Sequence, residues 1–123
     1  MKIILLISFL VLFPATVFAT NSSLDQVNQT VCDRFEADVA KLAAIMDEVR
    51  SRKGITQTRV AFGGVDTPIK SADYQITFAA EALAYQRAQK YSTQGNLRYS
   101  LEALKNKILS AKSYTQKAID YAQ

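Results

Sequence analysis

Few residues in this sequence could carry out chemistry, and their spacing does not suit catalysis. Cys32 is the only cysteine, and the chain contains no histidine. A reactive thiolate usually needs an imidazole or a comparable base beside it, so we expect Cys32 to be a small buried side chain. Asp47 and Glu48 are adjacent, but neighbouring residues of a helix point about 100° apart and cannot converge on one bond. Gly63-Gly64 alone does not make a phosphate-binding loop. We therefore predict a protein that is not an enzyme and that uses no cofactor or metal ion.

The first 19 residues have the pattern of a secretory signal peptide. Lys2 precedes an apolar run over residues 3–13, Pro14 ends that run, and Val17-Phe18-Ala19 has the small residues that a signal peptidase recognises. We expect cleavage after Ala19, which predicts a secreted or extracytoplasmic protein of the cell envelope without an integral membrane span. The alternative is that the leader stays as an uncleaved anchor, because its apolar length lies at the short limit of a spanning helix.

The residues after the leader, 20–123, are enough for one compact domain. The formal net charge of the full chain is +4, which is too small to indicate a nucleic-acid partner. Acidic residues concentrate in residues 23–49, and basic residues predominate from Arg50 onward. An acidic helix packed beside basic ones explains this asymmetry, and a charged binding surface is the alternative.

Hydrophobic residues recur every three or four positions in three segments, which predicts helices over about 23–52, 68–92 and 96–122. The last segment has a seven-residue repeat of the kind found in coiled coils. A short connection makes the second and third helices an antiparallel hairpin, and the first helix closes an all-α three-helix bundle against it. The predicted core comprises Leu24, Val27, Val31, Phe35, Val39, Leu42, Met46, Val49, Ala72, Ile76, Ala79, Ala80, Leu83, Leu97, Leu101, Leu104, Ile108, Ala111, Thr115, Ala118 and Ala122.

Local signals mark the ends of these helices. Ser22 or Ser23 can cap the first helix, and Gly54 can take the left-handed conformation that ends it. Asn96 can cap the third helix. The long loop between the first two helices contains residues 60–65, which are apolar for a loop and could form a small strand pair. Asn21 and Asn28 begin N-glycosylation patterns, which are weak signals.

Aromatic and basic residues are expected to meet at one pole of the bundle. If the turn between the second and third helices centres near Gln94, Tyr74 of the second helix lies level with Tyr114 of the third. Both then lie at the end where the first helix and the long loop meet. Arg50, Lys70 and Lys117 fall at the same pole. Tyrosine favours half-exposed positions, which suits recognition of an anionic partner, although the aromatic residues could simply complete the core. The candidate binding surface comprises Arg52, Lys53, Arg59, Phe62, Tyr74 and Tyr114.

The sequence thus predicts a small exported helical protein that acts as a non-catalytic binding or interaction module. Its expected partner is an anionic envelope component or an acidic protein. The alternative is a structural, self-associating helical bundle that binds no small ligand and whose long helices pair between copies. Nothing in the sequence transfers a known family function to this chain.

Overall fold

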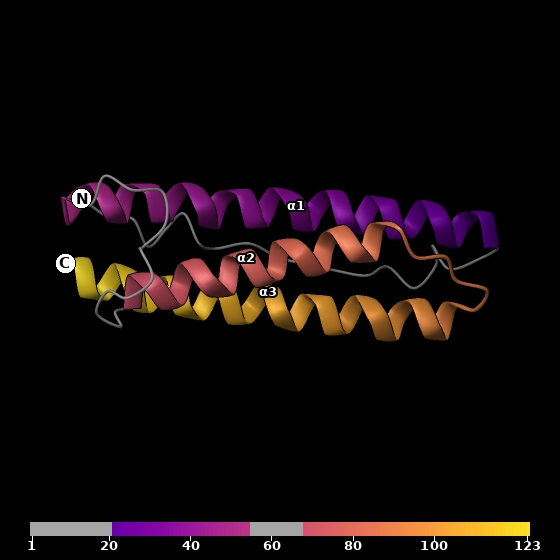
Figure 1. Cartoon of the computed structure of the whole chain (residues 1–123). Helices are drawn as coiled ribbons and strands as arrows, with labels where there is room; N and C mark the ends of the chain where they lie inside the picture. The colour runs from indigo at the N-terminus through magenta and orange to yellow at the C-terminus, as the bar shows by residue number, and fades with distance from the viewer. Residues whose placement is uncertain (1–20, 55–67) are drawn as a thin grey trace.

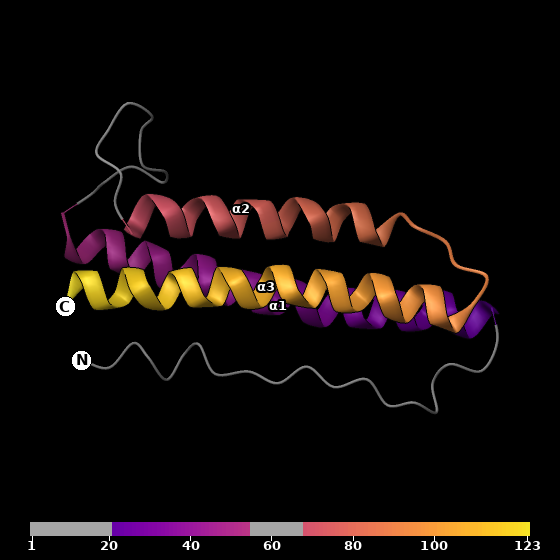
Figure 2. The same cartoon turned by 90° about the horizontal axis from the view of Figure 1, so that it is seen from below.

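The computed structural model describes residues 21–54 and 68–123, which contain three helices and no strand. These are α1 (Asn21–Arg52), α2 (Pro68–Arg87) and α3 (Gln94–Ala122). Figures 1 and 2 show α1 and α3 running in the same direction, with α2 antiparallel to both and lying across their shared side. Each helix packs against the other two. The predicted all-α three-helix bundle is therefore confirmed, whereas the signal peptide and the proposed strand pair lie outside the described residues.

The end of α1 follows the sequence signals, and its beginning does not. Gly54 has a φ of 72°, in the left-handed region that glycine adopts without strain. The amide of Lys53 still donates to the carbonyl of Val49, at 3.1 Å, so the chain leaves the helix at the predicted place. Ser22 and Ser23 lie inside α1, so the prediction that one of them is its N-cap is wrong.

The turn between α2 and α3 differs from its prediction at both ends. α2 ends at Arg87 rather than near residue 92, and its last turn tightens so that the Ala88 amide donates to the Tyr85 carbonyl at 3.2 Å. α3 begins at Gln94, because the Thr93 side chain accepts the Asn96 amide at 3.2 Å and is the N-cap. Asn96 is therefore a residue of the first helical turn and not the cap.

The core is continuous along all three helices. Of the predicted core positions, only Ala80 is exposed and Ala122 half-buried, and the rest are buried. Ala80 lies beside the buried stripe of α2, at a position that the neighbouring helices do not cover. Cys32 is fully buried, as expected. The core also includes Ile45, Ile69 and Ile119, which were not among the predicted core positions.

A buried polar network joins α1 to the end of α2. The Asn28 amide donates to the Gln86 carbonyl at 3.1 Å, and the Gln86 side chain donates to the Asn28 carbonyl oxygen at 2.9 Å. The Gln86 amide also donates to the Tyr91 hydroxyl at 3.0 Å. Beside them, Gln29 donates to the Arg87 carbonyl at 3.0 Å. Side chains of α1 thus satisfy the last carbonyls of α2, which explains why that helix ends where it does. Asn28 is buried, so the folded chain cannot present it for glycosylation.

Candidate functional site

Two lysine–tyrosine pairs lie at the bundle end where α1 and α3 finish. The Lys53 ammonium lies 4.6 Å from the centre of the Tyr121 ring, and the Lys117 ammonium lies 4.8 Å from that of Tyr114. Figures 1 and 2 both place the last turns of α1 and α3 side by side at this end. We call Lys53, Tyr114, Lys117 and Tyr121 the lysine–tyrosine pole. It brings together one helix end and one helix face through cation–π contacts.

The two lysines of this pole have no ion-pair partner among residues 21–54 and 68–123. Their neighbour Arg52 differs, because its guanidinium lies 3.2 Å from the exposed Glu48 carboxylate. Tyr114 is half-buried and packs against the core, which fixes its ring beneath the Lys117 ammonium. The positive charge at the pole is therefore concentrated on two ammonium groups that rings hold in place.

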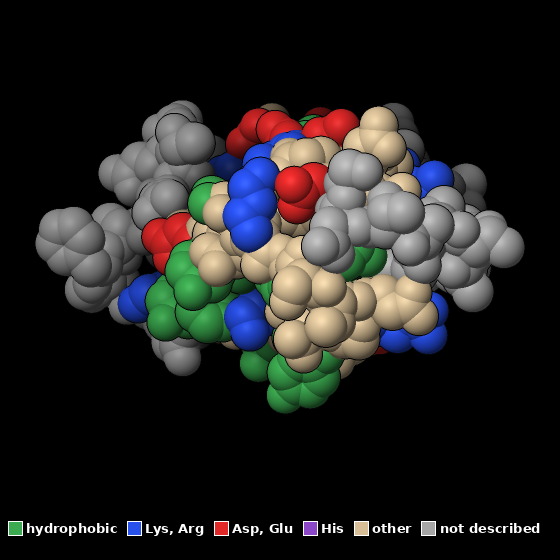
Figure 3. Space-filling view, turned by 90° about the vertical axis from the view of Figure 1, so that its right-hand side faces the viewer, with side chains coloured by type: hydrophobic (Ala, Val, Ile, Leu, Met, Phe, Trp, Pro, Cys, Tyr) green, Lys and Arg blue, Asp and Glu red, His purple; other side chains and the backbone are tan. Residues whose placement is uncertain are grey.

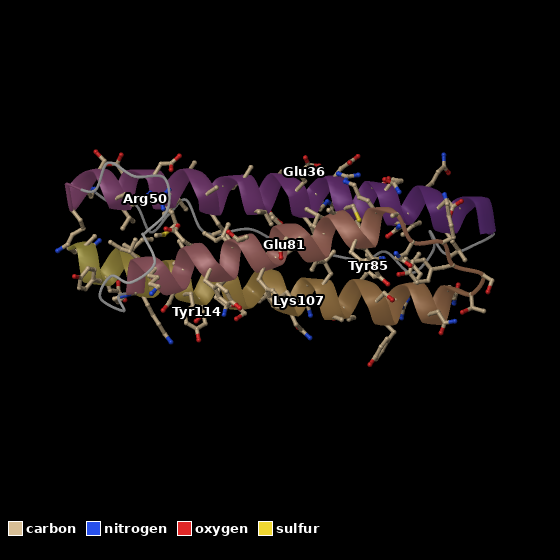
Figure 4. The ribbon with its side chains drawn as sticks, in the orientation of Figure 1. Glu36, Arg50, Glu81, Tyr85, Lys107 and Tyr114 are labelled. Carbon is tan, nitrogen blue, oxygen red and sulfur yellow. The ribbon has the colours of Figure 1, made fainter. Side chains whose placement is uncertain are left out.

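Arg50 lies at the predicted end of the bundle, in the last turn of α1, but its charge is enclosed by the fold. Its side chain is only 6% exposed and donates to both Asp73 carboxylate oxygens at 2.6 Å. It also donates to Asp47 at 2.5 Å. Burial lowers the pKa of Arg50, but the hydrogen bonds and charges of the two aspartates outweigh it and raise the pKa above its usual range. Arg50, labelled in Figure 4, is thus neutralised within the fold and ties α1 to α2.

Tyr74 contacts a different partner from Tyr114. Its ring stacks on Phe78 of the same helix, with centroids 6.4 Å apart and planes 4° from parallel. The Lys107 ammonium of α3 lies 5.6 Å from the Phe78 ring centre. Gln75 accepts from Ser110 at 3.4 Å, which places Tyr114 about one helical turn away from the level of Tyr74.

The exposed aromatic residues of α2 form a ridge along its outer face. We call Tyr74, Phe78, Glu81 and Tyr85 the α2 ridge, and Figure 4 shows Glu81 and Tyr85 on α2 with Lys107 and Tyr114 projecting from α3. In Figure 3, hydrophobic side chains gather on the flank formed by α2 and at the lower edge of the molecule, with basic side chains between them. Arg59 and Phe62, the two remaining predicted site residues, lie outside the described residues.

The Cys32 thiol is enclosed by the fold. It is buried beneath the α1–α2 network, and its sulfur lies 3.7 Å from the Asn28 side-chain oxygen. Burial raises its pKa to about 11, with smaller upward contributions from Asp33 and Glu36 and an opposing one from Arg87. At neutral pH the thiol is therefore protonated, and the fold encloses it.

One carboxylate oxygen of Asp38, Oδ2, is buried and has no hydrogen-bond partner among the described residues. It is the only such side-chain atom in the described part of the chain. The residue is only 5% exposed and is preceded and followed in α1 by the buried residues Phe35 and Leu42. Burial raises its pKa, and the nearby Lys41, Arg34 and Lys112 oppose that shift without cancelling it. The ionised form is thus less favourable in the folded state than in the unfolded chain.

Replacing Asp38 with asparagine is expected to raise the free energy of unfolding at pH 7 by roughly 1 kcal/mol. The raised pKa means that the wild-type cost appears as the pH rises through the unfolded value of 3.8 and is complete above the folded pKa. Urea unfolding of both proteins at pH 7 and at pH 3 measures the effect, and the difference should vanish at pH 3. Asp120→Asn is the exposed control, expected to change nothing at either pH. An Asp38→Asn variant that is less stable than the parent at pH 7 would contradict the argument.

Other kinds of site have no support in the described part of the chain. Residues 21–54 and 68–123 contain no group of three or more cysteine and acidic residues placed to hold a metal ion. None of the helices there is both long and apolar enough to cross a membrane. Comparison of the chain with protein-family models, with curated proteins and with solved structures found no match.

Proposed function

We propose that this protein is an exported, non-catalytic binding module that holds an anionic envelope component at the lysine–tyrosine pole. The observation that carries this proposal is the pair of ammonium groups, Lys53 and Lys117, each held over a tyrosine ring and neither neutralised by a carboxylate of the described residues. Other basic groups of the bundle are paired with carboxylates of the same chain, such as Arg50 with Asp73 and Arg87 with Asp33.

The chemistry of the pole suits phosphate or carboxylate groups. A ring beneath an ammonium restrains its position while leaving N–H donors directed to solvent, so little freedom is lost when an anion binds. The hydroxyls of Tyr114 and Tyr121 supply further donors at the same end. An anion bound here would sit between the ends of α1 and α3, because Lys53 directly follows α1 and the other three side chains come from α3.

The absence of a reactive constellation favours binding over catalysis. Cys32 is buried and protonated, the chain has no histidine, and Asp38 is enclosed by the core. The acidic first helix also does not require a charged partner, because Asp33 and Glu36 pair with Arg87 and Asp25 lies 3.6 Å from Lys90. The lysine–tyrosine pole is therefore the better place for an external anion than the face of α1.

The test is a double variant, Lys53→Gln with Lys117→Gln, compared with the control Lys41→Gln with Lys90→Gln, which has the same net charge. Each protein, without its leader, is incubated with envelope fractions of its own cells and with phosphatidylglycerol vesicles. Each lysine near an anionic surface contributes about 1 kcal/mol, so the pole variant should bind roughly tenfold or more weakly than the control. Raised salt should weaken the parent protein in the same way.

Equal binding of the pole variant and the control variant would overturn the proposal, since it would assign any attraction to net charge alone. Retention of an acidic protein from the fractions, with no binding to vesicles or to protein-stripped envelope material, would replace the proposed partner with a protein. Unfolding scans of both variants should match the parent, because exposed charges contribute little to stability.

A further inference from the structure

The α2 ridge is an exposed apolar surface that the bundle does not use. Tyr74 is 68% exposed, Phe78 47% and Tyr85 70%, although large aromatic side chains are normally covered in a folded domain. Figure 2 shows α1 and α3 together on one side of α2, and no other helix of the described residues on its opposite side. Exposed apolar side chains gathered on one helix face indicate a place of contact with another molecule.

The spacing of the ridge is the same in both chain directions. Tyr74, Phe78, Glu81 and Tyr85 are separated by four, three and four residues, so a reversed helix presents the same pattern at the same levels. We propose that a second copy of this chain packs antiparallel on the ridge, about a two-fold axis between Ala79 and Ala80. Tyr74 then packs against Tyr85 of the partner subunit, and the symmetric pair repeats this contact at the other end.

Charge complementarity selects a second copy over an unrelated helix. Glu81 forms no ion pair with the described residues, and neither does Lys107, whose ammonium lies over the Phe78 ring. The antiparallel arrangement brings Glu81 of the partner subunit level with Phe78, and so to the ammonium beside that ring. Because of the two-fold symmetry, the attraction between Glu81 and Lys107 occurs twice in the dimer. An acidic residue in the middle of the ridge would instead oppose an anionic surface.

The residues beside the ridge permit close approach of a second helix. Ala82 and Ala84 flank it on its two sides, and neither has a side chain long enough to hold another helix away. Aromatic pairs such as Tyr74 with Tyr85 of the partner subunit add geometric preference to the buried area. The face therefore has tyrosines at its two ends, a charged residue near its centre and alanines along its edges. This pattern favours a single register between the two antiparallel helices.

Sedimentation velocity over a range of protein concentrations tests the proposal, and the parent chain without its leader should show a monomer–dimer equilibrium. Glu81→Lys and Lys107→Glu should each raise the dimer dissociation constant roughly tenfold or more, because each places like charges together. The double swap, Glu81→Lys with Lys107→Glu, should restore association. Tyr85→Ala should abolish the dimer, while Tyr99→Ala, which removes an even more exposed tyrosine from α3, should leave it unchanged.

Cysteine cross-linking tests the register. A mixture of Tyr74→Cys and Tyr85→Cys chains should oxidise to a covalent dimer. Neither variant alone should do so, because each new thiol lies about 16 Å along the helix from its own counterpart. The native Cys32 does not interfere, since it is buried and protonated.

A parent protein that stays monomeric at every concentration would overturn this inference, as would a dimer that Glu81→Lys and Tyr85→Ala do not weaken. Cross-linking of one cysteine variant with itself, but not of the mixture, would contradict the antiparallel register. The Lys53→Gln, Lys117→Gln variant should form the dimer as the parent does. Failure of anion binding and failure of self-association are thus observed separately.

Discussion

Replacing Leu104 with alanine is expected to lower the free energy of unfolding by about 2–5 kcal/mol. Leu104 is 3% exposed and lies in the seam of α3 that faces both neighbouring helices, so truncation removes apolar contacts and leaves a cavity. The bundle cannot compensate through a cross-link, because Cys32 is its only cysteine. Denaturant unfolding followed by circular dichroism measures the loss, which is a large share of the stability of a domain of this size.

Leu109 provides a matched control on the same helix. It is 41% exposed, and Leu109→Ala should change the free energy of unfolding by no more than roughly 0.5 kcal/mol. Leu42→Ala and Ile108→Ala belong to the buried class and should resemble Leu104→Ala, because both side chains are at most 1% exposed. If the Leu104 and Leu109 variants unfold alike, the seam of α3 does not face the core and the packing described here is wrong.

The helical bundle could be predicted because hydrophobic periodicity records which face of each helix is buried. The four-and-three spacing from Leu97 to Ala118 fixes one stripe of α3, and that stripe is the buried one. The position of Gly54 fixes the end of α1 for an equally local reason, since only glycine adopts a positive φ at low cost. The buried face and the C-terminal end of a helix could therefore be predicted from the sequence of that helix alone.

The end of α2 could not be predicted in this way because residues far away in the chain determine it. Asn28 and Gln29 satisfy the carbonyls of Gln86 and Arg87 across 58 positions, and no local propensity contains that information. The same reason explains the burial of Arg50, whose partner Asp73 is on another helix. A polar residue within an apolar stripe was the available signal, and Asn28 and Gln86 each stand at such a position.

The candidate site was predictable only in part for a related reason. Lys53 and Tyr114 do lie at one end of the bundle, but Arg52 pairs with Glu48 and Tyr74 lies on the α2 ridge. The axial offset between α2 and α3 depends on the non-helical turn before Thr93. The predicted alignment of Tyr74 with Tyr114 is therefore displaced by about one helical turn. The aromatic residues Phe78 and Tyr85 became part of a candidate surface only once the three-dimensional arrangement showed them exposed on α2.

Replacing Arg50 with methionine is expected to destabilise the fold by about 3–5 kcal/mol, the usual cost of removing one partner from a buried ion pair. Methionine preserves much of the apolar stem of arginine but leaves the Asp73 carboxylate in a nearly enclosed site without its two charged hydrogen bonds. Asp47 is less affected, because its side chain is exposed to water. Thermal and urea unfolding should both show the loss.

Two further variants distinguish the effect of breaking the buried Arg50–Asp73 pair from the effect of removing any arginine charge. Arg52→Met removes an arginine two residues away whose partner Glu48 is exposed, and it should cost less than about 1 kcal/mol. Arg50→Met combined with Asp73→Leu removes both buried charges, and it should return most of the lost stability because an apolar pair of similar volume requires no compensation. If Arg50→Met is no worse than Arg52→Met, the Asp73 carboxylate is reached by water when its partner is missing. In that case the contact between α1 and the start of α2 depends on the packing of Ile69 and Val49, which lie beside the pair in the core, and not on the charge that crosses it.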